Sequence, residues 1–221
     1  PMFVARTMKK KIVTAAPSAS LFEAQRLMRE HTIRQVPVVS EDGTLLGIVS
    51  DRDIRAAVLP ADLVPGFTAG EAEKFMKNTP VERVMTRKVV TATLTDTLED
   101  AIVLLHDFRV NALPVVDAAG KVAGIITRTD VLEAFIDALG VGEVSSRLEV
   151  VVPDRPGTLA QLAAIIGSFN VNITSVLSSR HVEGGKRANF FRVATLNVGP
   201  IRKAIEEAGF EILDPSKFLL P

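Results

Sequence analysis

The chain has 221 residues, and 47% of them are hydrophobic, which is enough for a substantial buried core. Its 26 basic and 26 acidic residues cancel, which excludes the basic field typical of nucleic-acid binding and a polybasic membrane segment. Cysteine is absent, which excludes disulfides, thiolate metal sites and cysteine nucleophiles. The first residues lack the order of a signal peptide, and no apolar stretch approaches the ~20 residues that span a bilayer. We therefore expect a soluble, cytoplasmic, globular protein.

The chain contains an internal repeat. Residues 8–57 align with residues 85–134 at a constant offset of 77 residues and without a gap, and 16 of the 50 aligned pairs are identical. The two units therefore have to be interpreted together, because their identical positions indicate which residues the unit needs.

Each repeat predicts the order strand, helix, strand, strand, helix. In the first, a β-prone run at 12–14 precedes a helix that Ser20 opens in a capping box with Glu23. Strands at 36–39 and 45–49 follow, joined by an Asp-Gly turn, and then a second helix. The second repeat predicts the same elements, namely a strand at 89–91, a helix behind a Thr97/Asp100 capping box, strands at 113–116 and 122–126, and a helix from Thr127.

Residues 59–82 connect the two repeats and include a short helix predicted at 71–77. Their prolines and glycines favour a surface connector. The alternative is a lid or a protomer contact carried by Phe67, Phe75 and Met76.

Each repeat ends its last strand with a hydroxyl residue followed three positions later by aspartate. These pairs are Ser50 with Asp53 and Thr127 with Asp130. Such a pair is in itself a helix-capping motif. A strand that leads directly into a helix also offers backbone N–H groups and a hydroxyl to a phosphate, and the carboxylate could accept two ribose hydroxyls. The pattern therefore predicts either plain caps or a pair of nucleoside-phosphate sites.

Nearby glycines and arginines add to the second interpretation. Gly47 and Gly124 would allow a planar base to approach the strand backbone. Four arginines could supply charge to a phosphate, although each is individually typical of solvated surface: Arg34, Arg52, Arg109 and Arg128.

Together these motifs resemble a tandem pair of cystathionine-β-synthase (CBS) domains, a Bateman module. The matching features are the Pro-Val-Val strand, the glycine turn and the G-h-x-[ST]-x-x-D ending of both copies. The resemblance implies pseudo-twofold packing of the repeats around two clefts that bind AMP, ADP, ATP or S-adenosylmethionine. It also implies roles for particular residues, with Ser50 and Thr127 at phosphate, Asp53 and Asp130 at ribose, and Thr14, Val36, Pro37, Thr91, Leu113 and Pro114 around the base.

The two repeats differ where nucleotide-binding relatives often carry a basic pair. The first repeat has Arg34-Gln35 at this place and the second has Asn111-Ala112. The resemblance therefore implies that the second copy is poorer in phosphate-binding charge. This favours a less charged adenosyl ligand there, or loss of binding in one cleft.

The C-terminal third predicts the order βαββαβ, which is typical of ferredoxin-like folds. Its strands are expected at 147–152, 173–179, 187–195 and 210–213, with a hairpin turn at 183–186 and a helix at 200–208. The first helix is expected to have Asp154 or Arg155 at its cap and Pro156 in its first turn.

The segment D-R-P-G-T-L, followed by N-V-N-I, resembles an ACT domain, an amino-acid-sensing module. Such domains usually pair across subunits and bind a small ligand at the seam. The resemblance implies a loop side and a partner side, made of Asp154, Pro156, Gly157 and Thr158, and of Asn170, Asn172 and Ile173, respectively. The alternative is that these residues only shape a helix start and a turn.

No motif supplies a nucleophile with a base, and no metal-ligand spacing occurs, so we do not expect an enzyme. We predict an α/β (α+β) protein with CBS repeats at 1–68 and 69–142 and an ACT domain at 145–216. The combination resembles the AcuB-type acetoin-utilisation proteins. Our leading hypothesis is a homodimeric allosteric sensor of an adenosyl ligand and an amino acid, which regulates a separate enzyme. The alternative is a dimeric adaptor that regulates an enzyme or transporter with its clefts empty.

Overall fold

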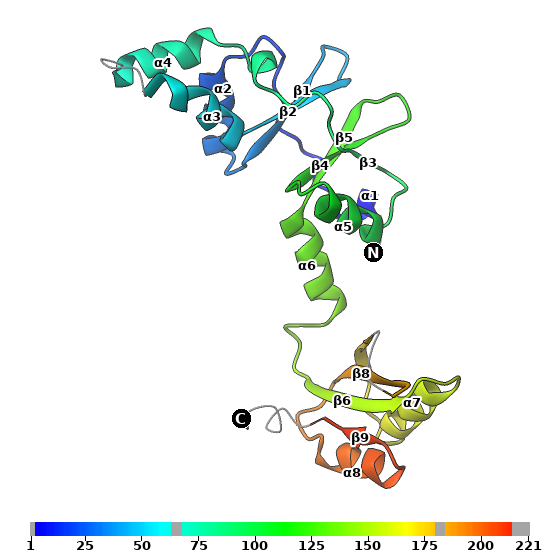
Figure 1. Cartoon of the computed structure of the whole chain (residues 1–221). Helices are drawn as coiled ribbons and strands as arrows, with labels where there is room; N and C mark the ends of the chain where they lie inside the picture. The colour runs from blue at the N-terminus through cyan, green and yellow to red at the C-terminus, as the bar shows by residue number, and fades with distance from the viewer. Residues whose placement is uncertain (1–2, 63–67, 180–183, 214–221) are drawn as a thin grey trace. The chain divides into compact units, whose positions relative to one another are not determined.

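A computed structural model describes residues 3–62, 68–179 and 184–213 (Figure 1). By its internal contacts the chain divides into two units, Pro1–Ala134 and Phe135–Pro221. Phe67, Glu183 and the expected end of the last domain at 214–216 lie outside the described residues.

The N-terminal unit contains both repeats. The first repeat consists of α1 (Val4–Thr7), α2 (Leu21–Glu30), β1 (Gln35–Val39), β2 (Leu45–Ser50) and α3 (Asp51–Asp62). The second consists of η1 (Val81–Arg83), β3 (Ala92–Thr93), α5 (Leu98–Asp107), β4 (Ala112–Val116), β5 (Val122–Thr127) and α6 (Arg128–Ala138). The four long strands lie within one residue of their predicted bounds, whereas α1 and η1 were not predicted.

Helices α2 and α5 start at their predicted caps, Ser20 and Thr97. Thr97 and Asp100 form a complete capping box at the start of α5. At α2 the Ser20 hydroxyl accepts a hydrogen bond from the Glu23 N–H at 3.1 Å. The return bond from the Glu23 side chain is absent from the described hydrogen bonds, so this capping box is only half formed.

The predicted first strand of each repeat was wrong in position. In the first repeat it is reduced to a single parallel bridge from Ala15 to Val38, and in the second it lies later, as β3, beside β4. Ala15 donates to the carbonyl of Pro37 and accepts from Val39. Pro37 has no N–H to donate, so the parallel ladder does not extend further toward the start of β1.

The leading segments of the two repeats, around Lys9 and around Thr86, are exchanged, because each pairs with the other repeat. Lys9 makes two backbone hydrogen bonds with Ile125 of the second repeat, at 2.9 and 3.0 Å. Thr86 makes the equivalent two bonds with Ile48 of the first repeat, at 3.0 and 2.9 Å. Each repeat therefore pairs its last strand with residues from the start of the other repeat.

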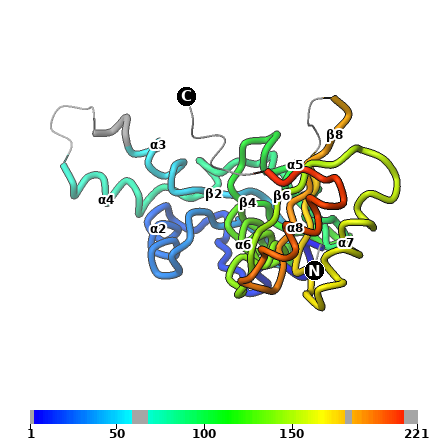
Figure 2. Tube along the Cα trace, turned by 90° about the horizontal axis from the view of Figure 1, so that it is seen from below, coloured from blue at the N-terminus to red at the C-terminus, as the bar shows by residue number. Residues whose placement is uncertain are grey.

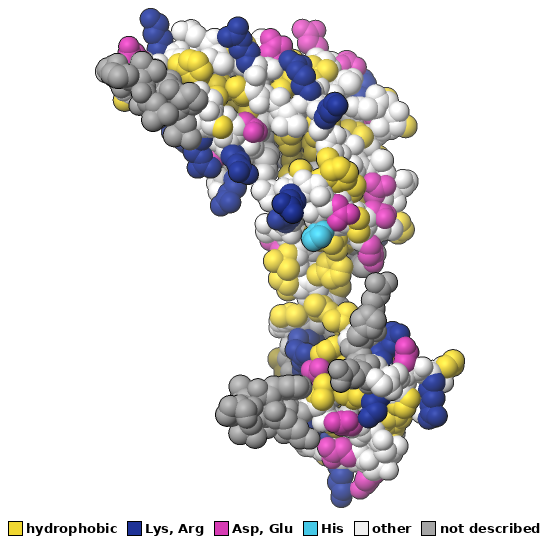
Figure 3. Space-filling model, viewed as in Figure 1, with side chains coloured by type: hydrophobic (Ala, Val, Ile, Leu, Met, Phe, Trp, Pro, Cys, Tyr) yellow, Lys and Arg dark blue, Asp and Glu magenta, His cyan; other side chains and the backbone are white. Residues whose placement is uncertain are grey.

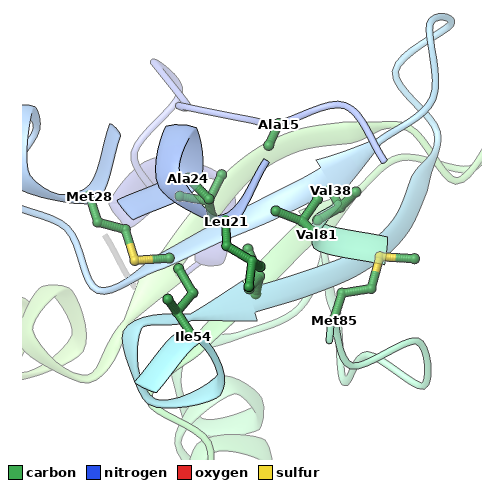
Figure 4. Packing of buried hydrophobic residues seen from close by; sticks show 10 residues of the cluster. Ala15, Leu21, Ala24, Met28, Val38, Ile54, Val81 and Met85 are labelled. Carbon is green, nitrogen blue, oxygen red and sulfur yellow. The ribbon is translucent and has the colours of Figure 1, made fainter. Parts of the chain in front are cut away.

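The exchange also completes the core of the first repeat. Val81, at the end of the connector, and Met85, just after it, pack among buried residues of the first repeat such as Leu21, Val38 and Ile54 (Figure 4). Val81 is fully buried and Met85 is 8% exposed. The two repeats therefore share side chains and cannot be treated as separate folding units.

The connector forms a longer helix than predicted, α4 (Ala69–Asn78), which begins with a complete Thr68/Glu71 capping box. It contacts α2 and α3, and it runs beside α3 in both Figure 1 and Figure 2. None of its residues is buried, although Met76 packs against the core of the first repeat. The helix therefore lies on the surface, with the Phe75 ring 37% exposed.

The C-terminal unit has the predicted βαββαβ order. Its elements are β6 (Ser146–Pro153), α7 (Thr158–Ser168), β7 (Ile173–Ser178), β8 (Lys186–Val193), α8 (Gly199–Glu207) and β9 (Glu211–Ile212). The sheet order is β7-β8-β6-β9 with antiparallel pairing throughout. Its core is formed by residues of the strands and both helices, with Leu148, Leu162, Phe191 and Ile205 at its centre.

The start of α7 differs from the prediction. Gly157 is the N-cap and has a left-handed φ of 87°. A residue in this conformation cannot belong to the helix, so α7 begins only at Thr158. Asp154 and Arg155 therefore lie before the cap, and Pro156 lies in the preceding turn rather than in the first helical turn.

None of the described helices is long and apolar enough to cross a membrane. On the face shown in Figure 3, basic and acidic side chains are interspersed rather than gathered into a field of one sign. This distribution agrees with the balanced composition of the sequence.

Candidate functional site

Two cavities of the N-terminal unit lie at the two predicted hydroxyl–aspartate motifs. Cleft 1 has a volume of about 380 Å³ and includes Ser50 and Asp53 in its lining. Cleft 2 has a volume of about 980 Å³ and includes Thr127. The sequence motifs thus coincide with hollows in the surface rather than with plain helix starts.

The two clefts are built from equivalent positions of the repeat. Lys88 and Val90 line cleft 1, and their equivalents Lys11 and Val13 line cleft 2. Because the leading segments are exchanged, each cleft combines the motif of one repeat with the lysine-bearing segment that begins the other. These segments lie outside the predicted motifs, although Lys11/Lys88 and Val13/Val90 are identical pairs of the repeat.

The motif forms a helix cap in both clefts. Asp53 Oδ2 accepts from the Ser50 N–H at 2.8 Å and from the Ser50 hydroxyl at 2.6 Å. Asp130 Oδ2 accepts the same two bonds from Thr127, at 2.8 and 2.5 Å. The hydroxyl proton is therefore already donated, so Ser50 or Thr127 could donate to a phosphate only if the cap opened.

The second oxygen of the aspartate distinguishes the two clefts. Asp130 Oδ1 pairs with the Lys9 ammonium at 3.1 Å, and the Asp130 side chain is only 5% exposed. Asp53 is half-buried, and it forms no ion pair among the described residues. Thr86 stands at the position equivalent to Lys9, and it has no charge to offer.

The arginines near the motifs are partly committed to the protein itself. In cleft 2 the Arg128 guanidinium donates to the carbonyls of Val110 and Leu105, at 2.9 and 3.0 Å. In cleft 1 Arg55 pairs with Asp51 at 2.9 Å. Neither guanidinium is therefore fully available to a phosphate.

The expectation that the second copy is poorer in phosphate-binding charge is wrong. Arg34 lines both clefts, and so does Asn111, so the contrast between these positions does not divide the two clefts. Cleft 2 is also lined by Lys9 and Lys11, and its lining includes no acidic residue. The sequence comparison failed here because it assigned each cleft to one repeat.

The expected role of the motif glycines is also wrong. A Cβ at Gly47 would lie 2.5 Å from Met85 Sδ, and a Cβ at Gly124 would collide in the same way with Met8 Sδ. The space next to each glycine is therefore filled by a methionine of the exchanged segment. The glycines serve packing between the repeats and leave no room there for a planar base.

Of the six residues expected around the base, one lines a cleft. It is Pro37, in the lining of cleft 2. The side chains of Val36 and Leu113 have no exposed surface and belong to the core, so they cannot contact a ligand. The remaining three, Thr14, Thr91 and Pro114, are outside the linings of both clefts.

The expected ACT ligand residues have structural contacts of their own. Asp154 pairs with Arg187 at 2.9 Å, and the buried Thr158 hydroxyl donates to the carbonyl of Arg155 at 3.0 Å. Asn170 has a left-handed φ of 56°, as a residue that ends a helix often does.

The rest of this group lies on the surface or at a strand start. Pro156, Gly157 and Asn172 are exposed, and Ile173 begins β7. A cavity of about 550 Å³ in the same unit is lined by Arg155, Gln161 and Phe210 rather than by the expected ligand residues.

Comparison with protein families gives this architecture a name. The CBS domain model matches residues 4–60 and 81–137. The chain belongs to the CBS domain family. The ACT domain model matches residues 146–210, so the CBS pair is followed by an ACT domain. Both family predictions from the sequence are confirmed.

Among its relatives, the CBS pair is similar to the uncharacterized protein MJ1426 of Methanocaldococcus jannaschii. The two are 37% identical over 155 residues, which cover 61% of this chain and 92% of MJ1426. The pair is also 27% identical to L-aspartate semialdehyde sulfurtransferase of the same organism, over 58% of this chain but only 22% of that enzyme. The similarity to the enzyme is therefore confined to a small part of it.

Solved structures of two similar proteins carry adenosine ligands. One is the CBS domain pair of protein MJ0100 in complex with 5′-methylthioadenosine and S-adenosyl-L-methionine, with a TM-score of 0.51 and 27% identity over 61% of this chain and 97% of that one. The other is CBSX2 in complex with AMP, with a TM-score of 0.52 and 30% identity over 62% of this chain and 98% of that one. CBS pairs of this shape thus bind adenosine compounds both with and without a phosphate.

Proposed function

We propose that this chain is a regulatory sensor that binds adenosine-type ligands in clefts 1 and 2 and is not itself an enzyme. The observation that carries the proposal is the equivalence of the clefts. Each joins the hydroxyl residue of a helix cap, Ser50 or Thr127, to a lysine segment from the other repeat, and a ligand held by both would bias how the repeats pack. The adenosine ligands of MJ0100 and CBSX2 support this ligand class.

The proposal extends to the ACT domain, the target and the subtype. An amino acid would bind at a seam between two copies of the C-terminal unit, and the homodimer would regulate a separate enzyme in the cytoplasm, as an AcuB-type protein. The edge strand β7 supports such pairing, because Val176 and Leu177 on it are 41% and 54% exposed. Light scattering of the pure chain tests the dimer, and calorimetry with amino acids tests the seam.

The test of the central proposal is binding to the wild-type chain and to a matched pair of variants. Isothermal titration with AMP, ATP, S-adenosylmethionine and 5′-methylthioadenosine should give micromolar to millimolar binding. Asp53→Asn keeps an acceptor for Ser50 but removes the charge that favours a ribose, so we expect adenosine affinity in cleft 1 to fall about tenfold.

The control is Asp100→Asn, which changes the same residue type in a capping box of the same geometry at α5, outside both clefts. Asp100→Asn should lose the stabilisation of the α5 cap but should bind the adenosine compounds as tightly as the wild type does. Equal loss of binding in both variants, or no binding by the wild type, would contradict the proposal.

A second candidate function is a dimeric adaptor whose clefts stay empty. It is favoured by the caps, in which hydroxyl and carboxylate already satisfy each other in both repeats. It predicts the same melting temperature for the chain with and without each of the four adenosine compounds.

A further inference from the structure

We propose that Lys9 imposes a phosphate requirement on cleft 2, so that cleft 2 accepts an adenosine ligand only if it carries phosphate, whereas cleft 1 accepts phosphate-free adenosyl ligands as well. This inference rests on the proposed function, because it concerns which adenosine ligands each cleft takes. It starts from the ion pair of Lys9 with Asp130, which has no counterpart at Asp53 among the described residues.

The Asp130 carboxylate has little capacity left for a ligand. Its Oδ2 accepts two hydrogen bonds from Thr127, and its Oδ1 pairs with the Lys9 ammonium at 3.1 Å. With only 5% of the side chain exposed, a ribose hydroxyl must displace the ammonium to reach Oδ1. The Lys9 ammonium, from a side chain that lines cleft 2, thus blocks the approach of a ribose from the cleft to Asp130.

A phosphate provides the means to open this contact. The Lys9 side chain is 65% exposed and lines cleft 2, so the ammonium can leave Asp130 for an anion in the cavity. A phosphate-bearing ligand offers that anion and brings the ribose hydroxyls to replace the ammonium at Oδ1. A phosphate-free ligand would separate the ion pair and leave the ammonium without a new partner.

Cleft 1 lacks this requirement. The residue equivalent to Lys9 is Thr86, whose backbone makes the same pair of hydrogen bonds but whose side chain carries no charge. Among the described residues no cation pairs with Asp53, so a ribose can reach its second oxygen without displacing one. The lining of cleft 1 also includes the carboxylate of Asp51, which makes it less selective for anions.

The repeat alignment supplies a reciprocal exchange as the test. Lys9→Thr gives cleft 2 the residue of cleft 1, and Thr86→Lys gives cleft 1 the residue of cleft 2. The full-length chain would be titrated calorimetrically with 5′-methylthioadenosine and with AMP, and Asp53→Asn identifies which site belongs to cleft 1. Both changes are at exposed side chains, so backbone pairing with Ile125 and Ile48 is preserved.

We expect the wild type to bind one 5′-methylthioadenosine and two AMP molecules per chain. Lys9→Thr should add a second site for 5′-methylthioadenosine and weaken AMP in cleft 2 about tenfold, while Thr86→Lys should weaken 5′-methylthioadenosine in cleft 1 about tenfold. If Lys9→Thr does not fold, the Thr86→Lys result decides alone.

Two results would overturn the inference and leave the proposed function standing. One is that 5′-methylthioadenosine fills both clefts of the wild type. The other is that Lys9→Thr and Thr86→Lys change the affinity of neither compound. If the wild type bound neither compound, the proposed function itself would be contradicted, and this inference with it.

Discussion

At the scale of single residues, two glycine–methionine contacts hold the repeats together. Met85 lies against Gly47 and Met8 lies against Gly124, where a Cβ would leave too little room. The alignment marks both glycines and both methionines as identical pairs, so the sequence shows that the four residues are needed. It cannot show that each methionine packs against the glycine of the other repeat, because that depends on the exchange of segments.

These contacts predict that a side chain added at Gly47 lowers the stability of the N-terminal unit. Gly47→Ala should destabilise the N-terminal unit by about 1–3 kcal/mol, because the new Cβ would lie 2.5 Å from Met85 Sδ and 3.0 Å from the carbonyl oxygen of Thr86. Urea unfolding measures the change. Met85→Ala combined with Gly47→Ala should cost less than the sum of the two single changes.

The control for the alanine itself is Gly70→Ala in the first turn of α4. There a Cβ would meet only the Thr68 hydroxyl, at 3.8 Å, so the change should be neutral or stabilise by up to about 1 kcal/mol. If both alanine variants behaved alike, packing against Met85 would not be the reason for Gly47.

At the scale of elements, the hairpins were easier to predict than the leading strands. Alternating apolar residues around a glycine turn fix β1 with β2 and β4 with β5 almost to the residue. The β-prone runs at 12–14 and 89–91 were misread, because Ile12, Val13, Val89 and Val90 line the clefts instead of pairing in a strand. A β-branched run has the same sequence pattern whether it pairs in a sheet or forms the wall of a cavity.

The β1–β2 turn predicts a dependence of stability on pH. The Asp42 carboxylate accepts hydrogen bonds from the hydroxyls of Ser40 and Thr44, at 2.6 and 2.9 Å. These bonds, with the Thr44 N–H and the more distant Lys121 ammonium, lower the pKa of Asp42 to about 2 from its ordinary value near 3.8. The turn is therefore stabilised fully above the ordinary pKa, and this contribution is lost as the pH falls through about 2.

Asp42→Asn should remove that contribution. The difference in unfolding free energy between wild type and variant should be constant from pH 7 to about 5 and should shrink between about pH 4 and pH 2. Chemical denaturation at a series of pH values measures it. A difference that stayed constant down to pH 2 would mean that the charge of Asp42 is not what the turn uses.

At the scale of the whole molecule, the exchange of leading segments was beyond prediction from the sequence. Ile48 and Ile125 are identical, and the residues around them are similar, so either leading segment could pair with either strand. Only the path of the chain through the connector selects one pairing. The same ambiguity makes the sequence alone assign charges to the wrong cleft, since Lys9 belongs to the start of the first repeat but lines the cleft of the second.

The exchange predicts that removing the start of the chain damages the far repeat. In a chain lacking residues 1–9, the Ile125 amide loses its acceptor, the Lys9 carbonyl, and Met8 leaves Gly124. Hydrogen–deuterium exchange should then show protection at Ile125 falling about tenfold or more. The Ile48 amide donates to Thr86, which the deletion leaves in place, so its protection should change little.

The same truncated chain distinguishes a leading segment that pairs with the other repeat from one that pairs within its own repeat. If the leading segment served the repeat that it precedes, protection would fall at Ile48 and not at Ile125. Cleft 2 would also lose Lys9 and its ion pair with Asp130, while cleft 1 would keep its lining. Loss of AMP binding in cleft 2 with binding retained in cleft 1 would therefore connect the backbone exchange to the ligand site, because the same nine residues provide both.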